Sequence, residues 1–109
     1  MKKSKILDAG CGAGRDVSYL LEEGLDVIGI DIAERLLEEA QKRVKQGKFM
    51  KMDLLNLEFP EKHFDGIWCM ATLADFEKKE SPKVLTNFNK VLKDNGIVYI
   101  AVKEGEGEQ

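Results

Sequence analysis

Glycines and one aspartate crowd together near the beginning of this 109-residue chain, in the stretch Asp8-Ala-Gly10-Cys-Gly12-Ala-Gly14. The stretch directly continues a short apolar run that starts at Ile6. Glycine adopts positive φ angles at no steric cost and, having no Cβ, lets the backbone come close to a ligand. We therefore expect a turn that cradles a ligand, followed by a helix whose N-terminus points at that ligand.

A second acidic residue, Asp31, ends the next β-rich run, 21 residues after Gly10. A carboxylate at that place can accept two hydrogen bonds from a ribose diol. A glycine pattern alone is also found in ordinary loops, but the strand-turn-helix context and the placed acid favour a binding site. The two features together predict a nucleoside pocket.

The spacing of the glycines distinguishes between nucleoside cofactors. A dinucleotide fingerprint has its third glycine three residues after the second, whereas Gly12 and Gly14 are two apart and Arg15 follows. Asp8, two residues before the first glycine, suits a cationic, amino-bearing ligand better than a pyrophosphate. A NAD(P)-binding module is therefore the less favoured interpretation.

The segments that must position these residues alternate between two hydrophobic periodicities. Short apolar runs predict strands, and apolar residues three or four apart predict helices. Ser81 and Pro82 fit the N-cap and first position of the last helix, and Asn95-Gly96 predicts a turn into the last strand. We expect strands over residues 6–9, 25–30, 49–52, 64–70 and 97–102, and helices over 15–23, 33–44 and 82–92.

Strands that alternate with helices predict an α/β sandwich of three layers with a mainly parallel sheet. The continuous apolar run 97–102 predicts that the last strand is buried on both faces. Ligands of such sheets bind at the carboxyl ends of the strands, where the glycine turn and Asp31 are predicted. We expect one domain over residues 1–109, with 103–109 as a flexible tail.

Composition and charge exclude several classes of protein. The 17 basic residues are interspersed with 20 acidic ones for a net charge of −3, so nucleic acid is not the expected ligand. No apolar run reaches the roughly 18 to 20 residues of a membrane span, and no signal-peptide core is present, so we expect a cytoplasmic protein. Cys11, Cys69 and the single His63 make no zinc set, and both thiols are expected to be reduced.

Five segments, taken in order over residues 6 to about 108, resemble the class I S-adenosylmethionine (SAM) dependent methyltransferases of the small methyltransferase-domain type. They are ILDAGCGAGRD, VIGIDIAERLLEEAQKR, FMKMDLLNLEFP, HFDGIWCMATL and VLKDNGIVYIAVKEGEGE. The resemblance implies a Rossmann-like sheet with strand order 3-2-1-4-5. It also implies SAM as the methyl donor, S-adenosylhomocysteine as the product and a small-molecule nucleophile as the acceptor.

The resemblance assigns the first two motifs to the methionine and ribose parts of SAM. It implies that Asp8 lies near the ammonium group and that Asp31 binds the ribose hydroxyls. Arg15 either reaches the SAM carboxylate or is solvated. The backbone around the methionine part would come from Gly10, Cys11, Gly12 and Gly14.

The later motifs are implied to surround the adenine and the methyl group. Ile32 would pack on the adenine face, and Asp53 with the Leu54 amide would meet the adenine edge. The lip between cofactor and substrate would consist of Cys69, Met70 and Ala71.

Other interpretations stay open for several of these residues. Asp53 can instead cap a turn, and Trp68 belongs either to the core or to a substrate platform. His63 has either a surface role or a role in proton transfer. No catalytic residue is assigned, and Asp75 is the only acidic candidate for a general base near the expected site.

Both ends of the chain depart from the family pattern. Family members usually add a helix and two antiparallel strands at the C-terminus and a helix at the N-terminus, and we expect this chain to lack them. A second interpretation is therefore a SAM-binding module without activity of its own, either needing a partner or being a truncated relic. Because strand 97–102 would keep an uncovered edge, we also expect a homodimer through that edge or the adjacent helix.

Overall fold

The computed structural model describes residues 3–72 and 81–103 of the chain. Strands and helices alternate along it, as the two hydrophobic periodicities predict. The elements are β1 (Lys5–Ala9), α1 (Arg15–Glu22), β2 (Asp26–Asp31), α2 (Glu34–Arg43), β3 (Lys48–Lys51), β4 (Phe64–Thr72), α4 (Ser81–Val91) and β5 (Leu92–Lys103).

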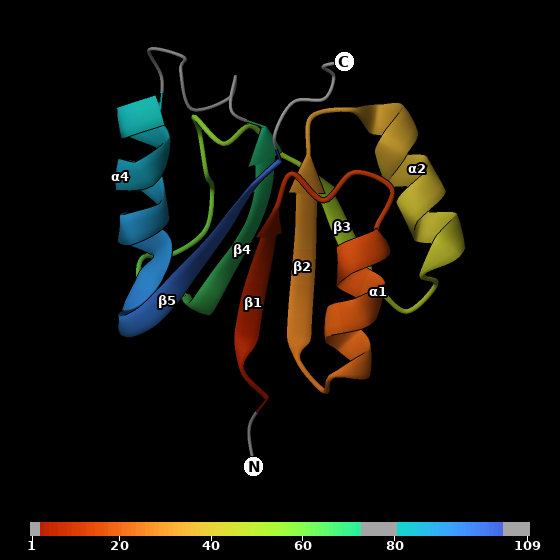
Figure 1. Cartoon of the computed structure of the whole chain (residues 1–109), viewed down its shortest axis with the longest axis horizontal. Coiled ribbons are helices and arrows are strands. Elements are labelled where there is room, and N and C mark those ends of the chain that lie inside the picture. The colour runs from red at the N-terminus through yellow and green to blue at the C-terminus, as the bar shows by residue number, and fades with distance from the viewer. Residues whose placement is uncertain (1–2, 73–80, 104–109) are drawn as a thin grey trace.

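The five strands form one parallel sheet in the order β3-β2-β1-β4-β5. Helices α1 and α2 lie on one side of this sheet and α4 lies on the other (Figure 1). Each parallel pair needs a crossover connection, and right-handed crossovers distribute the helices over both faces. The predicted three-layer α/β fold and strand order are therefore confirmed.

The sheet separates two hydrophobic cores. One core lies on the α4 side and includes Leu7, Phe64 and Phe88. The other lies on the side of α1 and α2 and includes Val17 and Val27. Side chains alternate between the faces of a strand, so the residues of β1 on either side of Leu7 face α1 and α2.

The start of α1 comes unusually close to α2. Gly14 begins the helix with a φ of 88°. A Cβ at Gly14 would lie only 3.0 Å from the Cβ of Ala40, which is fully buried in α2. The last glycine of the predicted turn is therefore needed both for its left-handed backbone and for this close approach.

Strand β5 differs from the prediction in its start and in its burial. The turn predicted at Asn95-Gly96 is wrong, because the strand begins at Leu92, immediately after α4, with a register irregularity opposite residues 64–66. Burial on both faces is also wrong, since Ile97 and Tyr99 are 72% and 51% exposed. Tyr99 stacks on Trp68, which packs against the core on the α1 side, so its side chain lies on the face of the sheet opposite to α4. The helix next to β5 in the described part of the chain is α4 (Figure 1).

Within the described part of the chain, no helix is long and apolar enough to cross a membrane.

Candidate cofactor site at the carboxyl ends of the strands

The glycine loop, residues 10–14, connects β1 to α1 and folds over the end of β2. Its three glycines have φ angles of 78°, 56° and 88°, as the sequence predicts. The amides of Gly10 and Cys11 both donate to the carbonyl oxygen of Ile30, at 2.9 and 2.8 Å. The loop is thus held on β2 by hydrogen bonds that its own backbone amides donate.

Asp31, the last residue of β2, joins this loop to the start of α2. One carboxylate oxygen accepts the Gly12 amide at 2.8 Å, and the other accepts the Ala33 amide at 2.9 Å. Each oxygen keeps a second lone pair that a hydroxyl donor can use. The structure therefore brings Asp31 and the glycine loop together, as the nucleoside-pocket prediction requires.

Among the described residues, Asp8 is the only charged residue that is buried, with 1% of its surface exposed. Its Oδ2 atom has no hydrogen-bond partner among the described residues. Burial first, and then the nearby charges of Asp16 and Asp31, raise the pKa of Asp8 to about 7. A buried, unpartnered carboxyl oxygen costs free energy, and a cationic donor would remove that cost, which fits the ammonium group expected here.

The Cys11 thiol is a packing group in this site. It is buried, and its Sγ lies 3.7 Å from the Gly12 carbonyl oxygen. Burial first, and then Asp8 and Asp31, raise the pKa of Cys11 to about 12. The side chain therefore remains a protonated thiol at neutral pH.

Gly29 is a site residue that sequence reasoning missed. A Cβ there would lie 2.9 Å from the Cβ of Cys11 and 3.0 Å from a ring carbon of Phe49. The missing side chain thus lets Cys11 and the glycine loop pack directly on β2. A glycine inside a strand pattern is the signal that marks such a close approach.

The residues expected around the adenine lie at the same edge of the sheet. Ile32 directly follows Asp31 and is 62% exposed, so its side chain is available as a packing surface. The Met52 amide donates to the Asp31 carbonyl at 3.1 Å, which brings the loop after β3 next to β2. In that loop, Asp53 accepts the Leu55 amide at 2.9 Å, so the turn-capping interpretation is confirmed. Leu54 is half-buried, and its carbonyl accepts the Asn87 side-chain amide at 2.9 Å.

The structure describes the positions of all the remaining candidates except Asp75. Cys69 is buried and pairs with Ala9 across the sheet, and Met70 and Ala71 continue β4 toward the same edge. Arg15 is exposed at the first position of α1. Asp75 lies outside the described residues.

Trp68 and His63 lie in different surroundings. Trp68 is half-buried and packs against the core on the α1 side, in agreement with the core interpretation. His63 precedes β4 and stacks on Phe59, with ring centroids 6.0 Å apart. Because parallel strands begin at the edge opposite to the glycine loop, His63 lies far from the site, as expected for a surface role.

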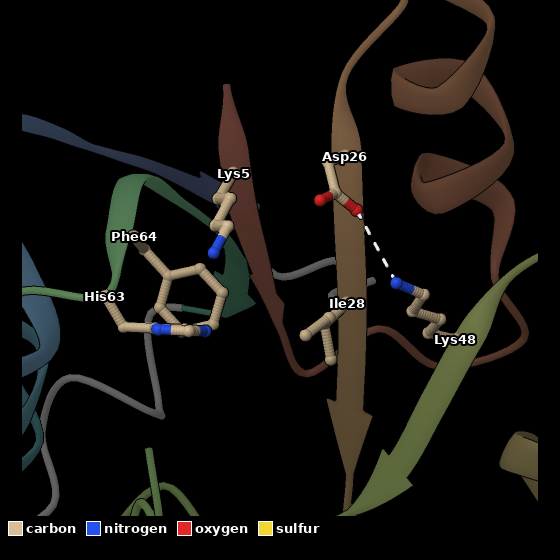
Figure 2. A pocket seen from close by; sticks show the side chains of 6 residues that line it. All are labelled: Lys5, Asp26, Ile28, Lys48, His63 and Phe64. Carbon is tan, nitrogen blue, oxygen red and sulfur yellow. Dashed lines mark ion pairs between the residues drawn. The ribbon is translucent and has the colours of Figure 1, made fainter. Parts of the chain in front are cut away.

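A hollow of about 130 Å³ also lies at this opposite edge. It is lined by residues from the starts of β1 to β4, namely Lys5, Asp26, Ile28, Lys48, His63 and Phe64 (Figure 2). None of the predicted binding residues contributes to it. Among the described residues, no group of His, Cys, Asp or Glu side chains could hold a metal ion.

Comparisons with known proteins agree with this arrangement. A demethylmenaquinone methyltransferase of Thermotoga maritima is 35% identical over 99 residues, which are 88% of this chain and 42% of that protein. A S-adenosyl-L-methionine-dependent Diels-Alderase of Talaromyces variabilis is 35% identical over 85% of this chain and 34% of its own length. The chain therefore spans about two-fifths or less of the length of these relatives.

A solved structure shows the same similarity in three dimensions. The TehB-like SAM-dependent methyltransferase of Corynebacterium glutamicum has a TM-score of 0.79 and 31% identity, covering 92% of this chain and 55% of that one. The family profile described as a methyltransferase domain matches residues 6–96. That range contains the whole glycine loop, Asp31 and the starts of β2, β3, β4 and β5, so the chain belongs to the methyltransferase domain family.

Proposed function

We propose that this domain binds SAM at the carboxyl edge of its sheet and presents the sulfonium methyl group to a small-molecule nucleophile. The observation that carries this proposal is the buried Asp8 carboxyl, whose Oδ2 has no partner among the described residues. A cationic N–H donor would satisfy that oxygen and hold the carboxyl in its ionised form. The ammonium group in the methionine part of SAM has this chemistry.

The other end of the cofactor finds matching groups across the same edge. The Asp31 carboxylate can accept hydrogen bonds from the ribose hydroxyls, and Ile32 offers an exposed apolar surface to the adenine ring. Asp53 caps its turn through one carboxylate oxygen, so its other oxygen and the Leu54 amide, in the loop next to Asp31, would meet the adenine edge. Gly10, Cys11, Gly12 and Gly14 line the methionine part with backbone, because no Cβ at the three glycines blocks the approach.

In this proposal, the residues of the chain bind SAM, orient its methyl group and shield it from water. When bound, SAM supplies an electrophilic methyl group, so the protein contributes mainly alignment and the exclusion of water. Cys69, Met70 and Ala71 at the end of β4 form the lip toward the acceptor. Asp75 stays the candidate for a general base.

A second candidate function is SAM binding without methyl transfer by this chain. The relative from Talaromyces variabilis, described as a SAM-dependent Diels-Alderase, favours this candidate because a Diels-Alder reaction is not a methyl transfer. Both functions use the same cofactor site. They differ only in whether a methyl group leaves the cofactor.

Titration calorimetry of the 109-residue chain with SAM, S-adenosylhomocysteine and NAD tests the shared part of both functions. We expect heat with the first two ligands and none with NAD. An absence of heat and of a thermal shift with S-adenosylhomocysteine at millimolar concentration would contradict both functions. A methyl-release assay with a panel of small oxygen, nitrogen and sulfur nucleophiles then separates methyl transfer from binding alone.

We also propose that the chain forms a homodimer through the edge of β5 or the adjacent α4 face. In the described sheet β5 pairs with β4 alone, and the exposed Ile97 and Tyr99 lie along it. Such an edge is a template for strand pairing. Sedimentation at tens of micromolar should show a dimer that Ile97→Lys weakens, since edge lysines block pairing. A monomer without any tendency to associate would refute the proposal.

A cytoplasmic location is proposed from the state of the Cys11 thiol. Cys11 is buried and forms no disulfide, and reduced thiols are typical of the reducing cytosol. Cell fractionation with an antibody to the chain tests this location. Recovery in an oxidising compartment would contradict it.

A further inference from the structure

The single tryptophan of the chain connects the middle of the sheet to the helix that follows the glycine loop. Trp68 lies on β4, in register with Asp8 on β1 and with Tyr99 on β5. Its indole Nε1 donates a hydrogen bond to Oδ2 of Asp16 at 3.0 Å. Asp16 belongs to the first turn of α1, two residues after Gly14. The bond therefore ends at the point where the loop becomes helix.

The indole of Trp68 also contacts a residue of β5. The rings of Trp68 and Tyr99 are stacked, with centroids 4.6 Å apart and planes inclined by 27°. Offset-stacked rings at this separation attract each other beyond their burial. The plane of the indole is thus fixed from β5 while its N–H group is fixed from α1, so Trp68 has little freedom to turn away from Asp16.

The first turn of α1 has few polar side-chain contacts besides this one. The N-cap residue Gly14 makes no side-chain capping bond, and Val17, the buried residue of that turn, is apolar and packs in the core on the α1 side. Among the described residues, the bond from Trp68 is the only side-chain hydrogen bond that joins α1 to the sheet. A carboxylate in the first helical turn also interacts favourably with the helix dipole.

We propose that Trp68, acting through Asp16, is a positioning residue that holds the first turn of α1 and the glycine loop in the arrangement that binds SAM. This inference rests on the proposed function, since it concerns the same site. Trp68 is not among the residues assigned to the cofactor. Losing the indole donor would let the first turn move away from β4 and would leave Asp16, Asp8 and Asp31 facing one another with one N–H group fewer.

The test compares variants that remove one side of the bond at a time. Trp68→Phe removes the donor and keeps an aromatic ring against Tyr99, and Asp16→Ala removes the acceptor. We expect each to weaken SAM binding about tenfold in calorimetry, the scale of one hydrogen bond to a charged group. The double variant should bind no more weakly than either single one. Asp16→Asn keeps an acceptor oxygen and should recover most of the affinity.

Leu21→Ala is the matched control, because Leu21 packs α1 against the same core but makes no contact with the first turn's hydrogen bond. It should lower the thermal midpoint while leaving SAM affinity within about twofold, which separates positioning from simple stabilisation. Trp68→Phe binding SAM as tightly as the parent chain would overturn the proposal. So would a loss in Asp16→Ala alone, which would make Asp16 a direct ligand contact.

Two measurements without ligand keep this test independent of the proposed function. The indole N–H signal in NMR should shift in Asp16→Ala and stay near its parent position in Asp16→Asn. The amides of Cys11 and Gly12 should exchange with solvent faster in Trp68→Phe than in Leu21→Ala. Unchanged amide exchange in Trp68→Phe would contradict the positioning role of Trp68, even if the chain does not bind SAM. Faster exchange in a chain that does not bind SAM would count against the proposed function alone.

Discussion

Two aspartates on neighbouring strands, Asp8 on β1 and Asp65 on β4, lie toward opposite edges of the sheet and have opposite environments. Asp65 accepts the Lys5 amide at 2.8 Å and pairs with the Lys93 ammonium at 3.2 Å, and these contacts hold its pKa below the ordinary value. Asp8 has a raised pKa because burial and two further carboxylates surround it. The amino edge thus satisfies its charges, whereas the carboxyl edge keeps an unsatisfied one.

The difference indicates where the fold is adapted to something other than its own stability. At the amino edge even the hollow of Figure 2 contains compensating charges, with Lys48 and Asp26 4.0 Å apart and open to solvent. At the carboxyl edge the chain concentrates a buried acid and a glycine loop at positive φ. Perturbed carboxyl groups gather at functional sites, so the comparison separates a binding edge from a purely structural one.

The largest expected effect comes from Asp8→Asn. The folded-state pKa is raised from 3.8 to about 7, so the protonated form contributes stability that is fully present below pH 3.8 and is lost as the pH rises through about 7. About three pKa units correspond to roughly 4 kcal/mol. In urea unfolding between pH 4 and 8, the free energy of unfolding of the variant should rise relative to that of the parent, by up to about that amount at pH 8. Parallel pH profiles of the two proteins would contradict the assignment.

Asp31→Ala should weaken SAM binding roughly 10- to 150-fold, from the loss of about 1.5 to 3 kcal/mol of charge-assisted hydrogen bonding. The structure adds a stability effect that sequence reasoning does not predict, because the same carboxylate holds the Gly12 and Ala33 amides. Calorimetry and urea unfolding measure the two effects separately. Asp26→Ala, at the other end of the same strand, is the control and should leave SAM affinity unchanged.

Gly29→Ala tests the packing of the loop on β2 without touching a charge. The new methyl group would meet Cys11 and Phe49 at 2.9 to 3.0 Å, and overpacking of this kind costs about 1 to 3 kcal/mol. Thermal and urea unfolding should show this loss. Gly24→Ala serves as a comparison, because nothing lies within 4 Å there and its cost comes from a φ of 86° alone.

The smallest effect is expected from Asp65→Asn, with a sign opposite to that of Asp8→Asn. A lowered pKa means that the ionised form contributes stability above the ordinary pKa, and that this stability is lost as the pH falls through the folded-state value. The variant should therefore be slightly less stable than the parent at pH 7 and equal to it in acid. Added salt should shrink the difference, since the group is exposed. A gain in stability at pH 7 would reverse the contrast between the edges.

The features that could be predicted from the sequence are those that local patterns encode. The glycine loop follows from residue types at fixed spacing, and its φ angles agree. The strand order was implied by the resemblance to the methyltransferases, and the sheet has that order. The start of β5 could not be predicted, because α4 passes directly into it and the Lys62 and His63 amides bond to the last carbonyls of the helix. Those partners come from a distant loop, so no cap residue marks the boundary.

The part of the site that follows from the ends of neighbouring strands could be predicted from the sequence. Asp31 and the glycine loop face each other because parallel strands end at one edge. The role of Asp16 was not predictable, since its partner Trp68 is 52 residues away in the sequence. The state of Asp8 was not predictable either, because its raised pKa comes from burial and from acids on other elements.

The central position of β1 has a consequence for how the chain is made. This first strand of the sheet pairs with β2 by Ile6 and Val27, but its other neighbour, β4, supplies Gly66 opposite the same Ile6. During synthesis one edge of β1 must therefore wait for a partner some sixty residues later. Such long-range pairing slows folding and leaves a strand edge open in the meantime. The order of translation thus leaves one edge of β1 unpaired until β4 has left the ribosome.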